Sequence, residues 1–150
     1  MATALKILSG RAISEAELHQ RLIKDFAELS NVDQEVNDTI EHLKDLHLIN
    51  DGRIAENFVL RYSHKGNRYI KAILAQKGIK KDIINEMMAT LDSEEQRAFI
   101  EAKKKLRSFK LDKNEESKLF RFLSGRGFAS DSIKKALLML KEECTDYAEV

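Results

Sequence analysis

The sequence predicts an all-α fold in which three tandem three-helix repeats form an elongated array. One reason is that segment 70–91 and segment 119–140 share the same pattern of apolar residues around a glycine, at a constant offset. A second reason is that proline is absent from all 150 residues, so nothing interrupts the runs of helical periodicity. A unit repeated in this way is typical of arrays whose members bury their apolar faces against one another.

The glycine in each copy predicts a tight corner between two helices. Gly78 and Gly127 each follow an apolar run, at the position where a left-handed residue commonly ends a helix. In the first copy, Ile79 stands five positions before Ile84, which is the spacing of a hydrophobic staple, and the second copy has the same arrangement. Each copy is therefore expected to be a helix, a glycine corner and a second helix.

The first repeat is expected over residues 2–46. A short helix over 2–9 is closed by Gly10, and Ser14 with Glu17 forms a capping box that starts the second helix.

The corner of the first repeat departs from the pattern. Phe26 occupies the position of the glycine, and five additional residues, 27–31, lengthen the turn. We expect Asp33 to be the N-cap of the third helix, because a short acidic side chain can accept from the free N–H groups of the first turn.

The second repeat is expected over residues 53–91, with a first helix from about Arg53 to Ser63 and then the glycine-cornered pair.

The third repeat is expected over residues 93–143. Ser93 starts a capping-box pattern that opens a helix to about Ser108, and the tail from Thr145 is expected to fray. The predicted apolar side of that helix contains Phe99, Ala102, Leu106 and Phe109.

Charge is balanced overall and polarised along the chain. The net charge is +1, yet residues 1–50 carry five basic and nine acidic side chains, and residues 51–91 carry eight basic and four acidic ones. Such polarisation gives an orientable electrostatic field. The single Cys144 excludes a disulfide within the chain. Neither a signal peptide nor an apolar run of membrane-spanning length is recognisable, so a cytoplasmic protein with no membrane partner is expected.

No catalytic constellation is recognisable, so we expect no catalytic residue, no metal site and no cofactor. The segment 125–127 stands at a helix end and reads as capping rather than as a phosphate loop. The four histidines lack the spacing of metal ligands. Asp82 and Asp131 lie in first helical turns, where a carboxylate suits the positive end of the helix dipole.

A basic run, interleaved with Tyr62 and Tyr69, occupies residues 61–81. The basic side chains could neutralise phosphates or meet an acidic protein groove, and the tyrosines could stack on bases. Alternatively, the run is a solvated helix face whose tyrosines are half-buried at a repeat boundary. The structural interpretation is favoured for Tyr62 and the functional one for the lysines. Phe120 is expected to pack against the neighbouring repeat.

An ordered set of segments resembles the RecX family, the bacterial regulators of the RecA recombinase, over about residues 4–140. The segments that carry the resemblance are 4–8, 14–18, 48–55, 76–79, 121–123 and 126–128. The chain departs from the family where Ile54 replaces the usual phenylalanine, where Tyr62 and Tyr69 replace arginines, and where a Gly-Pro pair is missing after Gly66.

The resemblance implies a nonenzymatic regulator of recombination, DNA repair and the SOS response that lies in the helical groove of a RecA–DNA filament. There it would inhibit strand exchange and ATP hydrolysis as a monomer, with single-stranded DNA within reach. By matching position, it places the following residues on the contact side: Lys65, Arg68, Lys71, Lys77, Arg121 and Arg126. Two alternatives remain: a helix-turn-helix-like module that acts directly on DNA, and a helical scaffold for other proteins.

Overall fold

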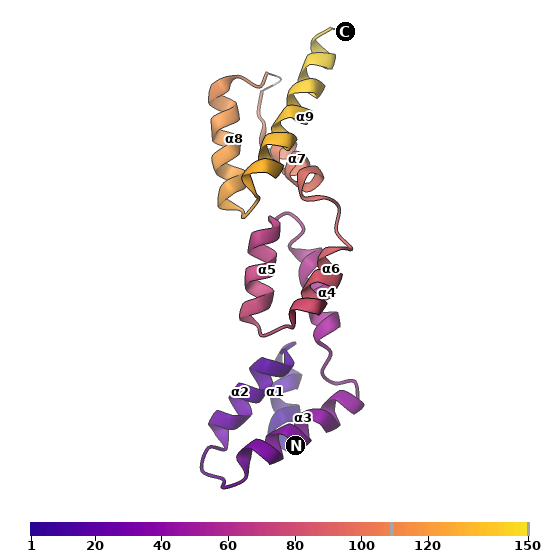
Figure 1. Cartoon of the computed structure of the whole chain (residues 1–150), viewed down its shortest axis with the longest axis vertical. Helices are drawn as coiled ribbons and strands as arrows, with labels where there is room; N and C mark the ends of the chain where they lie inside the picture. The colour runs from indigo at the N-terminus through magenta and orange to yellow at the C-terminus, as the bar shows by residue number, and fades with distance from the viewer. Residues whose placement is uncertain (109, 150) are drawn as a thin grey trace. The chain divides into compact units, whose positions relative to one another are not determined.

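The computed structural model describes residues 1–108 and 110–149, and all regular secondary structure in these ranges is helical. Figure 1 shows the helices in chain order. Their bounds are α1 Ala2–Gly10, α2 Glu15–Asp25, α3 Val32–Asp45, α4 Asp51–Arg61, α5 Asn67–Gln76, α6 Lys81–Met88, α7 Glu94–Lys105, α8 Lys113–Gly125 and α9 Ser130–Ala148. The predicted all-α fold of tandem three-helix repeats is confirmed, with α1–α3, α4–α6 and α7–α9 as first, second and third repeats.

Contacts divide the chain into two compact units. Unit 1 comprises Met1–Phe58 and Ile73–Met87, and unit 2 comprises Val59–Ala72 and Met88–Val150. The division falls inside α4 and α5 and before the last residue of α6, so the second repeat contributes to both units. Each unit thus contains one complete repeat and the junction that joins it to the second repeat.

The core of the first repeat is built from the apolar faces of α1, α2 and α3. The predicted capping box is confirmed, because Ser14 Oγ accepts from the N–H of Glu17 and Glu17 Oε2 accepts from the N–H of Ser14, both at 3.2 Å. The predicted N-cap of α3 is wrong: Asn31 precedes the helix, and Asp33 lies in its first turn. There its charge still favours the helix dipole. The buried core residues are Ala4, Ile13, Leu18, Leu22, Val36, Ile40, Leu43 and Ile49.

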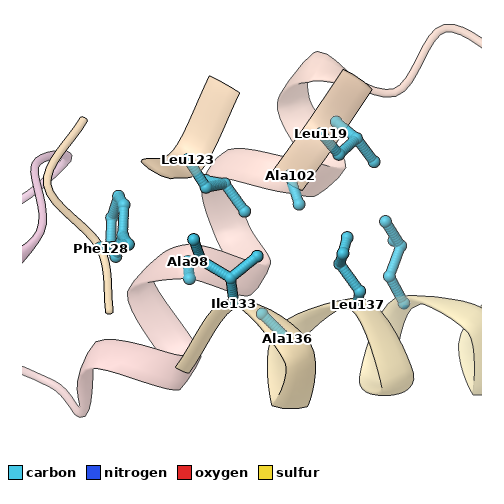
Figure 2. Packing of buried hydrophobic residues seen from close by; sticks show 9 residues of the cluster. Ala98, Ala102, Leu119, Leu123, Phe128, Ile133, Ala136 and Leu137 are labelled. Atoms are coloured by element: carbon cyan, nitrogen blue, oxygen red, sulfur yellow. The ribbon is translucent and has the colours of Figure 1, made fainter. Parts of the chain in front are cut away.

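The core of the third repeat lies between α7, α8 and α9. Figure 2 shows Leu119 and Leu123 of α8 pointing toward Ile133 and Leu137 of α9. Ala98 and Ala102 of α7 complete this core, and their small side chains let the helices approach closely.

Three predicted helix ends are corrected. α4 begins at Asp51 rather than Arg53, and α7 ends at Lys105 because Leu106 adopts an extended backbone conformation. α9 continues to Ala148, so residues 145–148 are helical rather than frayed. Phe99 and Leu106 pack on the core as expected, whereas Phe109 lies outside the described residues.

The glycine corners are confirmed in both copies. Gly78 has φ 75° and Gly127 has φ 88°, in the left-handed region that favours glycine. The N–H of Ile79 donates to Leu74 O, and the N–H of Phe128 donates to Leu123 O, both at 3.2 Å. This six-to-one bond is the mark of a Schellman motif.

The corner of the second repeat docks on the start of α2. A Cβ added to Gly78 would stand 2.4 Å from the Cβ of Ala16, so the corner approaches α2 too closely for any side chain at this position. Two polar bonds flank this contact: the hydroxyl of Ser14 donates to the carbonyl oxygen of Lys77, and the N–H of Glu15 donates to Asp51 Oδ1 at 2.9 Å. The first residue of α4 therefore caps the N-terminus of α2 across the repeat boundary.

The junction between the second and third repeats uses the same positions. The N–H of Gly66, the residue before α5, donates to the carbonyl oxygen of Arg126 at 2.9 Å. The N–H of Asn67 donates at 2.8 Å to Oε1 of Glu94, the first residue of α7. A Cβ added to Gly66 would stand 2.1 Å from the backbone of Gly127. In both junctions, the next repeat thus supplies a glycine corner and a capping carboxylate.

Arg97 adds a further set of bonds to the second junction. It is 5% exposed, and its guanidinium donates to the carbonyl oxygens of Asp92 at 3.0 Å, Ser63 at 3.1 Å and Lys65 at 2.6 Å, and to the Asn67 side chain. Burial lowers the pKa of Arg97, and the carboxylate of Glu94 opposes this change. The loop between α4 and α5 is thereby bound to α7.

Gly66→Ala should lower the free energy of unfolding by about 1–3 kcal/mol, because the new methyl group would meet rigid backbone. Urea denaturation followed by circular dichroism measures this change. Gly125→Ala is the matched control in the same unit, since no atom lies within 4 Å of its added Cβ. Equal stability of the two variants would show that the close junction at Gly66 does not exist.

Asp51 provides a pH-dependent test of the first junction. Burial raises the pKa of its carboxyl, the N–H of Glu15 opposes this effect, and the carboxylate of Glu15 adds to it. Asp51→Ala should cost about 1 kcal/mol through loss of the cap. Asp51→Asn keeps an acceptor without a charge to desolvate, so it should be at least as stable as the wild type at neutral pH.

The sign of the pH effect follows from proton uptake. As the pH falls through the raised pKa, folded Asp51 binds a proton before the unfolded chain does, so the wild type gains stability relative to Asp51→Asn. Urea denaturation over a pH series measures this difference. A difference that does not change with pH would contradict the assigned environment of Asp51.

Candidate functional site

The predicted contact residues are divided between the two units. Lys65, Arg68, Lys71, Arg121 and Arg126 belong to unit 2, and Lys77 belongs to unit 1. A single face that includes all six therefore stays a prediction.

Lys65 lies in an aromatic cluster at the end of α4. Its ammonium group stands 5.1 Å from the ring centroid of Tyr69, and the Tyr62 ring lies 6.1 Å from that of Tyr69 and 6.0 Å from that of His64. All four side chains are half-buried. The half-buried Tyr62 matches the structural interpretation of this residue, and cation–π attraction holds Lys65 beside the rings.

Lys77 and Arg126 occupy equivalent positions, just before the two corner glycines, and both form ion pairs within the chain. Lys77 Nζ lies 3.7 Å from Glu17 Oε1, and an Arg126 guanidinium nitrogen lies 3.1 Å from Glu101 Oε2. The guanidinium of Arg126 also stands 4.4 Å from the ring centroid of Phe122. These two cations therefore contribute to the junctions, and a partner would have to compete with the carboxylates.

Arg68, Lys71 and Arg121 are the most accessible of the six. All three are exposed, and none forms an ion pair with another described residue. Arg68 and Lys71 are three residues apart on α5, a spacing that places them on one helical face. They are therefore the best placed to meet an anionic surface.

Three residues have roles that the sequence did not indicate. Arg97 and Glu101 are charged yet lie on the buried side of α7 beside Ala98 and Ala102, and Glu94 accepts from both Asn67 and Ser132. The sequence does carry one sign of the roles of Arg97 and Glu101. They stand four residues apart beside the predicted apolar positions of this helix, so they share one helical face next to the core. Phe120 packs on the core of its own repeat, so the expected contact with a neighbouring repeat is wrong.

The side chains gathered around the predicted contact residues are cations and aromatic rings. In residues 1–108 and 110–149, no three His, Cys, Asp or Glu side chains come together as metal ligands. Nor does any helix there combine the length and apolarity that crossing a bilayer requires. Charged recognition is the chemistry that this arrangement supports.

Comparison with known proteins identifies the family. Residues 92–137 match the family model described as "RecX, third three-helix domain". A Regulatory protein RecX from Clostridium beijerinckii is 34% identical over 150 residues, covering 90% of this chain and 67% of the relative. A Regulatory protein RecX from Neisseria meningitidis is 30% identical over 137 residues, covering 91% of this chain and 87% of the relative.

A solved structure agrees with these sequence matches. The crystal structure of RecX from Lactobacillus salivarius has a TM-score of 0.76 at 25% identity, with 93% of this chain and 92% of that one covered. The chain spans between 58% and 67% of the length of the Clostridium botulinum, Clostridium beijerinckii and Clostridium perfringens relatives. With the repeat architecture and these similarities together, the chain belongs to the RecX family.

Proposed function

We propose that this protein is a cytoplasmic regulator of the RecA recombinase that binds in the helical groove of the RecA filament and inhibits strand exchange and ATP hydrolysis. Membership in a family whose curated members are named Regulatory protein RecX carries the proposal. The protein needs no catalytic group for this function, because occupying the groove is sufficient to hinder a second DNA strand.

The exposed cations of α5 supply the contact in this proposal. Arg68 and Lys71 lie on one helical face without an ion pair among the described residues. They can therefore meet acidic groove walls or DNA phosphates without first breaking an ion pair within the chain. Oppositely charged surfaces accelerate association and fix its orientation. Arg121 of α8 offers a third accessible cation.

The double substitution Arg68→Glu and Lys71→Glu should raise the concentration needed to inhibit RecA ATPase on single-stranded DNA by roughly tenfold or more, equivalent to ~1.4 kcal/mol of binding. The reason is that each reversal replaces an attraction by a repulsion. Titration of the variant into an ATPase assay measures the effect.

The matched control is Lys6→Glu with Lys24→Glu, which makes the same charge change at exposed positions of the first repeat. Lys77→Glu is a poor choice, because it would also place a second carboxylate beside Glu17. If the α5 variant and the control inhibit equally while both stay folded, α5 is not the contact.

A helix-turn-helix-like DNA-binding module is the second candidate, favoured by the tight Gly127 corner between α8 and α9 and by exposed Lys134 and Lys141 on α9. If this candidate holds, duplex DNA is bound without RecA, with sequence preference and an affinity that falls steeply with salt. Fluorescence anisotropy over a salt series measures both. Binding that requires RecA would favour the filament proposal.

A further inference from the structure

In the first junction, the corner of the second repeat contacts a groove between two helices of the first repeat. In unit 1, a groove of about 360 Å³ runs between α2 and α3, with Ala16 and Ile40 among its lining. The second repeat reaches it through Asp51, Gly78 and Lys80. The groove between the second and third helices of a repeat is therefore the seat for a neighbouring helix corner.

The third repeat has the same groove between α8 and α9, with a volume of about 770 Å³. Counted back from the corner, Ser117 corresponds to Ala16. Counted from the first buried apolar residue of the third helix, Val36 or Ile133, Leu137 corresponds to Ile40. No further helix corner among the described residues lines this groove, whereas Asp51, Gly78 and Lys80 of the second repeat cover part of its counterpart.

The chemistry of this open groove is apolar with a basic rim. Phe120 and Leu138 line it, and Leu138 is 60% exposed. Its rim carries Lys113, Arg121 and Lys134 against the single carboxylate of Glu116, and these three cations form no ion pair within the described part of the chain. Such a groove favours an apolar corner surrounded by carboxylates.

The first repeat presents a corner of that kind. Phe26 and Leu29, between α2 and α3, are 38% and 49% exposed. The carboxylates of Asp25, Glu28 and Asp33 flank them, and all three are exposed. This corner differs from the glycine corners in having bulky side chains, which suit the uncovered apolar groove of the third repeat.

We propose that the α2–α3 corner of one copy of this chain docks in the α8–α9 groove of a second copy. The interface is head-to-tail, so it joins different surfaces of the two partners and leaves one corner and one groove open at the ends. One corner in one groove is a small contact, and its ion pairs are screened by salt. The protein is then a monomer in dilute solution and associates as its concentration rises. This inference does not depend on the proposed regulation of RecA.

Sedimentation velocity over a concentration series tests the proposal, at low and at high salt. The wild-type average mass should rise with concentration at low salt and fall back toward the monomer at high salt. A groove variant, Arg121→Glu with Leu138→Glu, and a corner variant, Phe26→Ser with Leu29→Ser, should each remain monomeric. All four positions are exposed, and circular dichroism verifies that both variants fold.

Mixing the two variants is the decisive measurement. The groove variant keeps an intact corner and the corner variant keeps an intact groove, so an equimolar mixture should form a dimer and nothing larger. Lys141→Glu, an exposed change on α9 outside the groove, should behave as the wild type. A wild type that stays monomeric at every concentration, variants that associate like the wild type, or a mixture that gives no dimer would overturn the proposal.

Discussion

A carboxylate that caps a helix belonging to the preceding repeat is the interaction on which the described junctions depend. Asp51 accepts from the N–H of Glu15, and Glu94 accepts from the N–H of Asn67. The free N–H groups at a helix start need an acceptor, and here the acceptor comes from the first residue of another helix. A glycine corner beside each cap lets the backbones approach, so polar satisfaction and close packing are achieved at the same place.

Local features of the fold were predictable from the sequence, whereas the junctions were not. The Ser14 capping box and the glycines at 78 and 127 act within a few residues, so their spacing is sufficient to identify them. The Asp51–Glu15 bond joins positions 36 residues apart, and no local pattern indicates it. The ends of α7 and α9 were also missed, because no glycine or proline in the sequence marks the extended Leu106 or the end of the exposed helical residues 145–148.

In the candidate site too, the local pattern was predictable from the sequence, whereas the contacts between distant residues were not. A basic run predicts that cations are abundant, and the structure finds Arg68 and Lys71 exposed on one helix face. Sequence reasoning could not separate these from Lys77 and Arg126, whose carboxylate partners stand 60 and 25 residues away along the chain. Charge at a position and availability of that charge to a partner are different properties, and three-dimensional contacts determine the second.

The bonds of Arg97 have a consequence for how mutational data on this protein are read. Its guanidinium links α7 to the backbone carbonyls of Ser63 and Lys65, immediately before the helix that bears Arg68 and Lys71. Replacing it would leave several partly buried backbone carbonyls without this donor and release that helix from its support. A mutational screen that measures only loss of regulation would group Arg97 with the surface cations, although its side chain is buried and supports the helix that carries them.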